Sequence, residues 1–239
     1  MNERLTILSL EIIACLVAVL VGILEGNGAV FFFNRIPAEW FCDYGEKPTA
    51  EMLDRSTQRV KSYPWKYVFT MGFIILNIKM VTDDWQFAIP GTIALWLLLE
   101  LSISDIKYQI VPDQLLILLT VTGLGFMPYR STWKEAAFGA AIGFGLMFII
   151  ALIGKLTYKR DTIGGGDIKL FTILGFISGP IGFAFIFVVS TLLSAGHFVY
   201  LLAKKRVKAT DARPMVPYIS VAAALHIVFF WDTFTQWLI

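Results

Sequence analysis

Long apolar runs alternate with short polar ones along almost the whole sequence. A helix needs about 20 residues to cross the roughly 30 Å hydrocarbon core of a bilayer, and most of these runs approach that length. The pattern predicts eight membrane-spanning helices, at residues 5–24, 67–81, 87–103, 113–127, 135–157, 168–179, 181–203 and 215–237. The expected fold is therefore all-α, a polytopic membrane helix bundle.

The boundary between the sixth and seventh helices is the least marked of these. It rests on Gly179-Pro180, because proline interrupts the hydrogen bonding of a helix. A single kinked helix across this point would give seven spans instead of eight.

The basic residues favour the count of eight. With eight spans and the N-terminus outside, 16 lysines and arginines fall in inner loops and three in outer ones. Cytoplasmic loops are enriched in these residues. Merging the sixth and seventh spans would move the basic cluster at 204–213 to the outside, against that rule. The net charge of +2 then reflects topology and contact with anionic lipid headgroups, and it gives no reason to expect nucleic-acid binding.

One membrane domain is expected over residues 1–239, because only one sizeable polar stretch interrupts the apolar runs. This stretch, residues 26–66, is the predicted cytoplasmic loop. Within it, Met52, Leu53 and Val60 are spaced among charged residues, which predicts a short amphipathic helix on the membrane surface.

The glycines of the fifth predicted helix and the two cysteines have simple interpretations. Gly139, Gly143 and Gly145 lie in the fifth predicted helix, where small residues four apart let helices approach closely in lipid. The cysteines are only two, Cys15 and Cys42, too few to hold a zinc ion by themselves. No metal site is therefore expected.

Two aspartates stand at the edges of apolar segments. Asp105 follows the third predicted helix, and Asp167 closes the run Gly164-Gly165-Gly166 before the sixth. A charged side chain at the centre of a membrane helix costs roughly 2.5–3.5 kcal/mol, so such residues usually mark function. Three consecutive glycines cost backbone entropy, and irregular backbone at membrane depth persists only where protein or a water-filled cavity surrounds it.

Both aspartates fall on the predicted cytoplasmic side, where they can act as a pair. Two close carboxyl groups do not both ionise readily, so they would share one proton near neutrality. One would then activate a water molecule as general base while the other, protonated, donates a hydrogen bond to the scissile carbonyl. This is the chemistry of an aspartic protease. Asp113, by contrast, is interpreted as a helix cap, and a capping role is also the simplest structural alternative for Asp167.

An ordered set of motifs resembles the type IV prepilin peptidase family, which are membrane aspartic proteases of the GxGD class. The set comprises Asn34-Arg35-Ile36-Pro37, Asp105 with Pro112-Asp113, Gly164-Gly165-Gly166-Asp167 with Lys169, and Arg213-Pro214-Met215-Val216-Pro217-Tyr218. The resemblance implies that Asp105 and Asp167 are catalytic, with Gly164, Gly165, Gly166 and Lys169 as the supporting loop. Proteolysis of this kind requires no cofactor.

The resemblance also implies partners and a location. The substrates would be prepilins or pseudopilins with a short leader and an apolar N-terminal helix, cut on the cytoplasmic face of the cell membrane, in a type IV pilus or protein-secretion system. Many members carry two Cys-x-x-Cys pairs in the first cytoplasmic loop and also methylate the new N-terminus with S-adenosylmethionine. This chain has only Cys42 there, which leaves methyl transfer by the 26–66 region open.

Two other functions remain to be compared. A proton- or cation-coupled transporter would use Glu11, Glu100, Asp105 and Asp167 as intramembrane carboxylates, but the sequence has no evident repeat between its halves. Signal peptide peptidases also use a GxGD aspartate. They generally carry the first aspartate in a Tyr-Asp pair, whereas Ser104 precedes Asp105 here.

Overall fold

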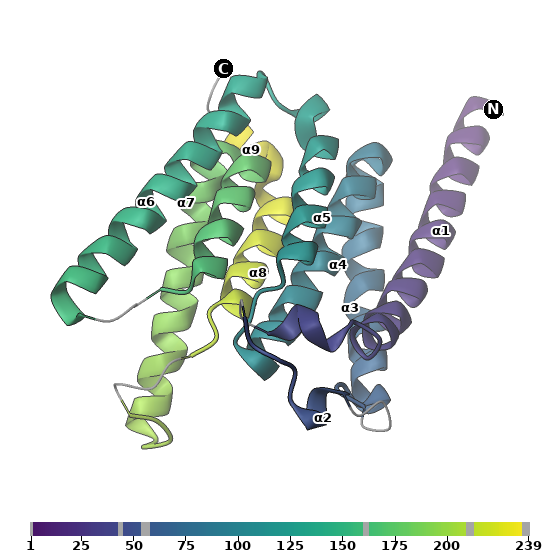
Figure 1. Ribbon diagram of the computed structural model, residues 1–239. Helices are drawn as coiled ribbons and strands as arrows, with labels where there is room; N and C mark the ends of the chain where they lie inside the picture. The colour runs from purple at the N-terminus through teal and green to yellow at the C-terminus, as the bar shows by residue number, and fades with distance from the viewer. Residues whose placement is uncertain (1, 43–44, 54–57, 160–162, 209–212, 236–239) are drawn as a thin grey trace. The chain divides into compact units, whose positions relative to one another are not determined.

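The computed structural model describes residues 2–42, 45–53, 58–159, 163–208 and 213–235, and these ranges contain helices and connections but no strand (Figure 1). The predicted all-α fold class is confirmed. The chain divides into two compact units, residues 1–96 and 97–239, which are taken in turn. That residues 1–239 form one peptidase domain stays a prediction.

The first unit contains two long helices, α1 (Asn2–Phe33) and α3 (Ser62–Asp83), and the beginning of α4 (Trp85–Tyr108). A 3-10 helix, η1 (Ala38–Phe41), and the short α2 (Ala50–Leu53) lie between α1 and α3. Helix α2 includes two of the three apolar residues on which the predicted amphipathic helix rested.

Helix α1 continues nine residues beyond its predicted end, so the connection to α3 is shorter than the predicted loop 26–66. The extension includes the acidic residue Glu25, which directly follows the predicted end of the helix at residue 24. Glu25 is bonded inside the unit: Asn77 Nδ2 donates to its Oε2 at 2.7 Å, and the Thr92 hydroxyl lies 2.5 Å from its Oε1. These polar partners let the helix continue through an acidic position.

Glycines set the crossing of α1 and α3. A Cβ added at Gly22 would lie 2.7 Å from the backbone nitrogen of Ile74, and one at Gly26 would meet Thr70. The two glycines are four residues apart, so both face α3 and allow the backbones to touch.

The second unit holds the remaining helices around one core. In chain order these are the end of α4, α5 (Asp113–Gly123), η2 (Leu124–Tyr129), α6 (Trp133–Tyr158), α7 (Gly165–Ala203), α8 (Val216–Leu225), a π-helical turn η3 (His226–Phe230) and α9 (Trp231–Thr235). Its centre is built from fully buried Leu101, Leu115, Leu170, Phe171 and Ile219.

Helix α7 is a helical hairpin folded at Gly179. That residue has φ +67° and ψ −177°, a non-helical conformation inside the 39 residues assigned to α7. In a straight helix Phe171 and Phe187 would be about 24 Å apart at 1.5 Å per residue, yet their ring centroids are 5.8 Å apart. The chain therefore reverses, giving a first leg (residues 165–178) and a second leg (residues 180–203), as Figure 1 shows.

The tip of this hairpin is held by Arg130, which follows η2. Its guanidinium donates to the carbonyl oxygen of Ile177, at the C-terminal end of the first leg, and lies 3.6 Å from Glu135 and 5.1 Å from the Trp231 ring centre. Burial lowers the pKa of Arg130 to about 10, so the side chain remains charged at neutral pH. The cation thus meets the negative end of the first leg's dipole.

Within the residues that the structure describes, five helices are long and apolar enough to cross a membrane: Ser9–Phe33, Trp85–Tyr108, Trp133–Thr157, Gly165–Ala203 and Val216–Thr233. The chain is a multi-pass membrane protein. The predicted count of eight is compatible with this structure, because α3 and α5 lie at the other predicted positions and Gly165–Ala203 is two antiparallel legs.

The predicted close packing of the fifth span is present at two of its three glycines. A Cβ at Gly139 would meet the backbone of Gly175 in α7, and one at Gly143 would lie 2.6 Å from the Phe171 carbonyl oxygen. Gly145 faces open space and has no such role.

Candidate active site

Asp105 lies on the last turn of α4 and is only 6% exposed. Its Oδ2 accepts a hydrogen bond of 2.8 Å from the backbone N–H of Val216, the first residue of α8. Helix α4 ends at Tyr108, and the next residue, Gln109, has φ +54° and donates its N–H to the Asp105 carbonyl oxygen. The Ser104 hydroxyl donates to the Ile110 carbonyl at 2.6 Å, which holds the following connection against the helix.

Asp167 lies in the first turn of α7 and is half-buried. The N-cap of the helix is Gly164, so the capping role considered for Asp167 belongs to another residue. The Asp167 carboxylate instead turns back and accepts a hydrogen bond from the Gly164 N–H, as an acidic residue three positions after an N-cap often does. A Cβ at position 164 would lie 3.5 Å from Asp167 Oδ2, an ordinary van der Waals contact, so this approach does not itself require glycine there.

The structure brings Asp105 and Asp167 together. The negative charge of Asp105 acts directly on the Asp167 carboxyl group. The connection after α4 also touches the turn that carries Asp167: a Cβ at Gly166 would lie 2.6 Å from the Val111 Cβ. A glycine is therefore needed at 166 for this approach, whereas Gly165 faces open space.

Lys169 binds Asp113 beside the pair. Its Nζ donates to both carboxylate oxygens of Asp113, at 2.7 and 2.8 Å, across an exposed ion pair. Asp113 is the first residue of α5, after an N-cap at Pro112, and no side-chain capping bond is made there. The interpretation of Asp113 as a capping residue is therefore wrong: its carboxylate links the start of α5 to the start of α7.

Glu100 does not join this site. It lies on α4 with no exposed surface, and neither carboxylate oxygen has a hydrogen-bond partner among the described residues. Glu100, one of the carboxylates that the transporter alternative would use, is thus completely buried.

Two contacts of this site were missed by sequence reasoning. The Val216 N–H that binds Asp105 comes from a motif noted only for its resemblance, and no side-chain pattern marks a backbone donor. The second is the Ser102 hydroxyl, which lies 2.8 Å from that of Ser220 and joins α4 to α8 just below Asp105. Nothing in the sequence around Ser102 or Ser220 indicates that these two serines lie together.

The motif at residues 34–37 has an internal structural role in the first unit. The Asn34 side chain donates to the Val30 and Val60 carbonyls at 2.8 and 2.9 Å and accepts from the Val60 N–H at 2.9 Å. Arg59 donates to the carbonyl oxygens of Ile36 and Met52. These groups are already used by the fold, and so the motif holds the connection against the end of α1.

Fold and site together define a multi-pass helical membrane protein with two interacting carboxyl groups at one end of its second unit. Residues 92–199, which include both aspartates, match the type IV leader peptidase family, Peptidase_A24. The resemblance to the type IV prepilin peptidases is thereby confirmed over this segment of the chain.

Individual relatives agree. The chain is 30% identical over 192 residues to the prepilin leader peptidase/N-methyltransferase of Xanthomonas campestris pv. campestris, covering 75% of this chain and 64% of the relative. It is 28% identical over 145 residues to the protein of the same name from Bacillus subtilis, covering 57% and 54%. The chain thus spans less than two thirds of the length of these relatives. No solved structure matches the chain. None of these similarities supports the transporter alternative.

Proposed function

We propose that this protein is a membrane aspartic endopeptidase that removes the leader of type IV prepilins or pseudopilins, with Asp105 and Asp167 as its catalytic pair. The observation that carries the proposal is the approach of the connection after Asp105 to the turn that carries Asp167, where Val111 lies against Gly166. This approach brings the charge of Asp105 to bear on Asp167 inside the segment that matches the leader peptidase family. Substrates would present a short leader in the cytoplasm, followed by an apolar helix in the membrane.

The chemistry follows from two carboxyl groups that share one proton. One carboxylate takes a proton from water, which attacks the scissile carbonyl carbon. The protonated partner donates a hydrogen bond to the carbonyl oxygen, and a proton is then delivered to the leaving amine as the C–N bond breaks. Gly164, Gly165 and Gly166 hold the turn that carries Asp167, and Lys169 fixes that turn through Asp113.

The active site is proposed to face the cytoplasm across the cell membrane. Support comes from the eight-span prediction, in which Asp105 and Asp167 lie in inner loops. Three further residues, Asp113, Lys169 and Val216, lie at the inner ends of predicted spans. All five lie in the second unit, and contacts among them join four helices at one end.

The direct test uses purified protein and a candidate prepilin in a bilayer or detergent, with product mass as readout. Asp105→Asn and Asp167→Asn are each expected to lower the cleavage rate by about 10²- to 10⁴-fold, the range typical for loss of an acid–base group. Asp232→Asn is the matched control, since this exposed aspartate lies in α9. Full cleavage by either asparagine variant of the pair would contradict the proposal.

Methyl transfer from S-adenosylmethionine is the second outcome of the same assay. The relatives are named for both activities, whereas in the motif at 34–37 the Asn34 side chain is bonded into the fold. Adding the methyl donor separates the two cases, because leader loss alone and leader loss with one added methyl group differ in product mass.

A further inference from the structure

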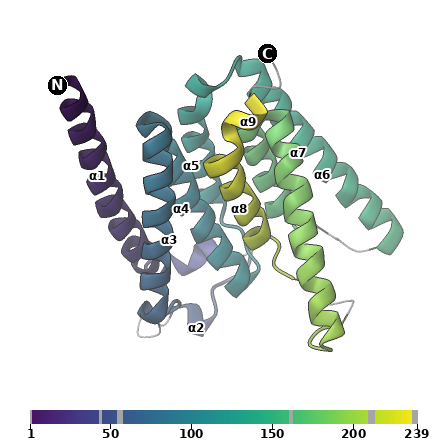
Figure 2. The ribbon, with the colours of Figure 1, turned by 180° about the vertical axis from the view of Figure 1, so that it is seen from behind.

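A cavity of about 580 Å³ lies in the second unit, with Ile106, the residue after Asp105, in its lining. One wall is the second leg of α7, between Thr191 and Leu201, and the other is the segment that leads into α8. The second leg and α8 run side by side (Figure 2), and His197 Nδ1 and the Tyr218 hydroxyl share a hydrogen bond between them.

The cavity shares residues with the catalytic neighbourhood. Ile106, next to Asp105, and Met215, next to Val216, both line it. The Val216 N–H is the group that binds Asp105 Oδ2. Because these lining residues are direct neighbours of Asp105 and Val216 and an extended chain advances about 3.3–3.6 Å per residue, we expect a substrate side chain in the cavity to lie within one or two positions of the scissile bond.

The lining defines what the cavity accepts. Ala195, Phe198, Pro214 and Pro217 supply apolar surface, and Arg213 places a positive charge at the cavity. No acidic residue is among the described lining residues. A basic side chain would meet the charge of Arg213 and no carboxylate here, whereas an apolar side chain would bury its surface.

We propose that this cavity binds an apolar side chain of the substrate at the first or second position after the scissile bond, and so selects the residue with which the mature chain begins. The inference rests on the proposed leader-peptidase function. In such a substrate the polar, basic leader precedes the cut and the apolar segment follows it. Only the residues after the cut therefore match the apolar lining of the cavity.

The test compares two substrates that differ only in the first residue after the cut, phenylalanine or alanine. Ala195→Phe fills the cavity. It is expected to lower kcat/KM for the phenylalanine substrate about tenfold or more relative to the alanine substrate, the range for excluding an apolar group from a pocket. Gly196→Phe is the matched control, because this neighbouring position faces open space and does not line the cavity. It should leave the ratio unchanged.

A second pair of substrates differs only in the residue before the cut. For this pair, Ala195→Phe is expected to leave the ratio of kcat/KM values unchanged. If Ala195→Phe changed that ratio instead, or changed neither ratio, the inference would be wrong. A ratio that depended on bilayer composition and not on the substrate residue would assign the cavity to lipid and would also overturn it. Failure of the unaltered protein to cut any substrate would contradict the proposed function itself.

Phe198→Ala keeps the test decisive if Ala195→Phe does not yield a monodisperse protein. This substitution enlarges the cavity, so it is expected to raise the relative kcat/KM for a substrate that begins with tryptophan by about threefold or more. An unchanged preference in a folded Phe198→Ala protein would overturn the inference.

Discussion

Gly166 is the residue on which the geometry of the aspartate pair depends most directly. Gly166→Ala would place a Cβ 2.6 Å from the Val111 Cβ, so the turn carrying Asp167 or the connection after Asp105 must move. A displacement near 1 Å at reacting groups can cost about 10²-fold. We expect a loss of kcat/KM of at least about tenfold, measured by leader cleavage.

The neighbouring glycine supplies the control for this prediction. Gly165→Ala adds a Cβ in open space and should leave kcat/KM within about twofold, because nothing has to shift. Combining Gly166→Ala with Val111→Gly removes the colliding atoms and should restore part of the activity. Equal losses in both alanine variants would show that backbone freedom, and not the contact with Val111, is what the run of glycines provides.

The pair formed by Lys169 and Asp113 is expected to position the catalytic turn weakly. The two side chains are 56% and 61% exposed, so their interaction contributes about 0.2–1 kcal/mol. Asp113→Asn and Lys169→Gln should each lower cleavage by a few-fold at most, and the double variant should be no worse than either single one. Additive losses in this double-mutant cycle would contradict a direct coupling.

At the scale of single elements, the hairpin in α7 depends on Gly179. Its φ of +67° with ψ −177° is accessible almost only to glycine, and an added Cβ would meet the Arg130 guanidinium. Gly179→Ala is expected to destabilise the protein by about 1–3 kcal/mol, seen as a lower thermal midpoint in detergent. Gly196→Ala, in the second leg and facing open space, should stabilise its helix by about 0.5–1 kcal/mol. A thermal midpoint unaffected by Gly179→Ala would contradict the requirement for glycine at this turn.

Sequence reasoning located the helices more reliably than their ends. Gly179-Pro180 was sufficient to predict a boundary, because both residues disfavour a continuous helix. The end of α1 was missed because Glu25 looks like a terminal acidic residue. Its partners Asn77 and Thr92 lie 52 and 67 residues away, so only the packed helices reveal that a carboxylate is accommodated there.

The same distinction holds for the site. Asp105 and Asp167 could be singled out because ionisable residues and glycines are rare within apolar runs. The Val216 backbone donor lies 111 residues from Asp105, and the ion pair of Asp113 with Lys169 spans 56. Such partners depend on which helix ends meet, and a capping position and an inter-helix ion pair look alike in sequence.

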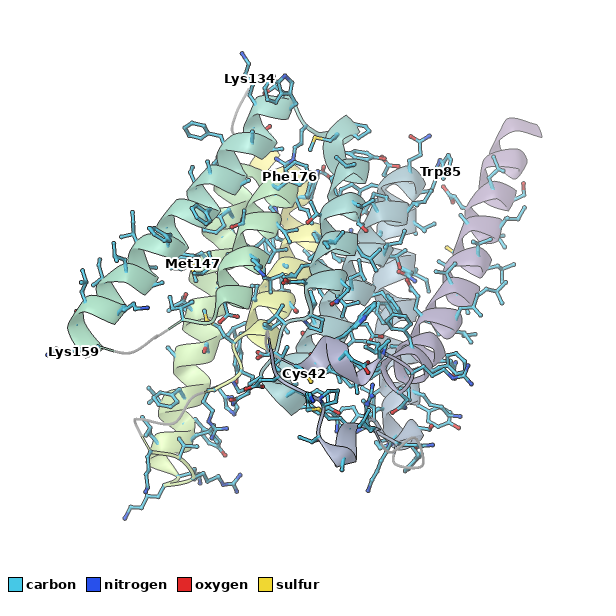
Figure 3. The ribbon with its side chains drawn as sticks, in the orientation of Figure 1. Cys42, Trp85, Lys134, Met147, Lys159 and Phe176 are labelled. Atoms are coloured by element: carbon cyan, nitrogen blue, oxygen red, sulfur yellow. The ribbon has the colours of Figure 1, made fainter. Side chains whose placement is uncertain are left out.

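Across the whole molecule, contacts in the second unit agree with the predicted loops. Arg130, from a predicted outer loop, meets Gly179 at the predicted outer end of a span. Asp105 and Asp167, from predicted inner loops, meet elsewhere, and Val216 at the predicted inner end of the last span binds Asp105 there. The two ends of α6 provide markers for these sides: Lys134 lies near its beginning and Lys159 just beyond its end (Figure 3).

The orientation can therefore be tested on α6 alone. In a protein with Cys15→Ser and Cys42→Ser, single cysteines are placed at the exposed positions Ser131 and Thr157. The positive-inside bias of 16 basic residues to three predicts that an impermeant thiol reagent labels Ser131→Cys in intact cells. Thr157→Cys should react only after the membrane is opened. The reverse pattern would put the aspartate pair on the outer face, where a leader held in the cytoplasm could not reach it.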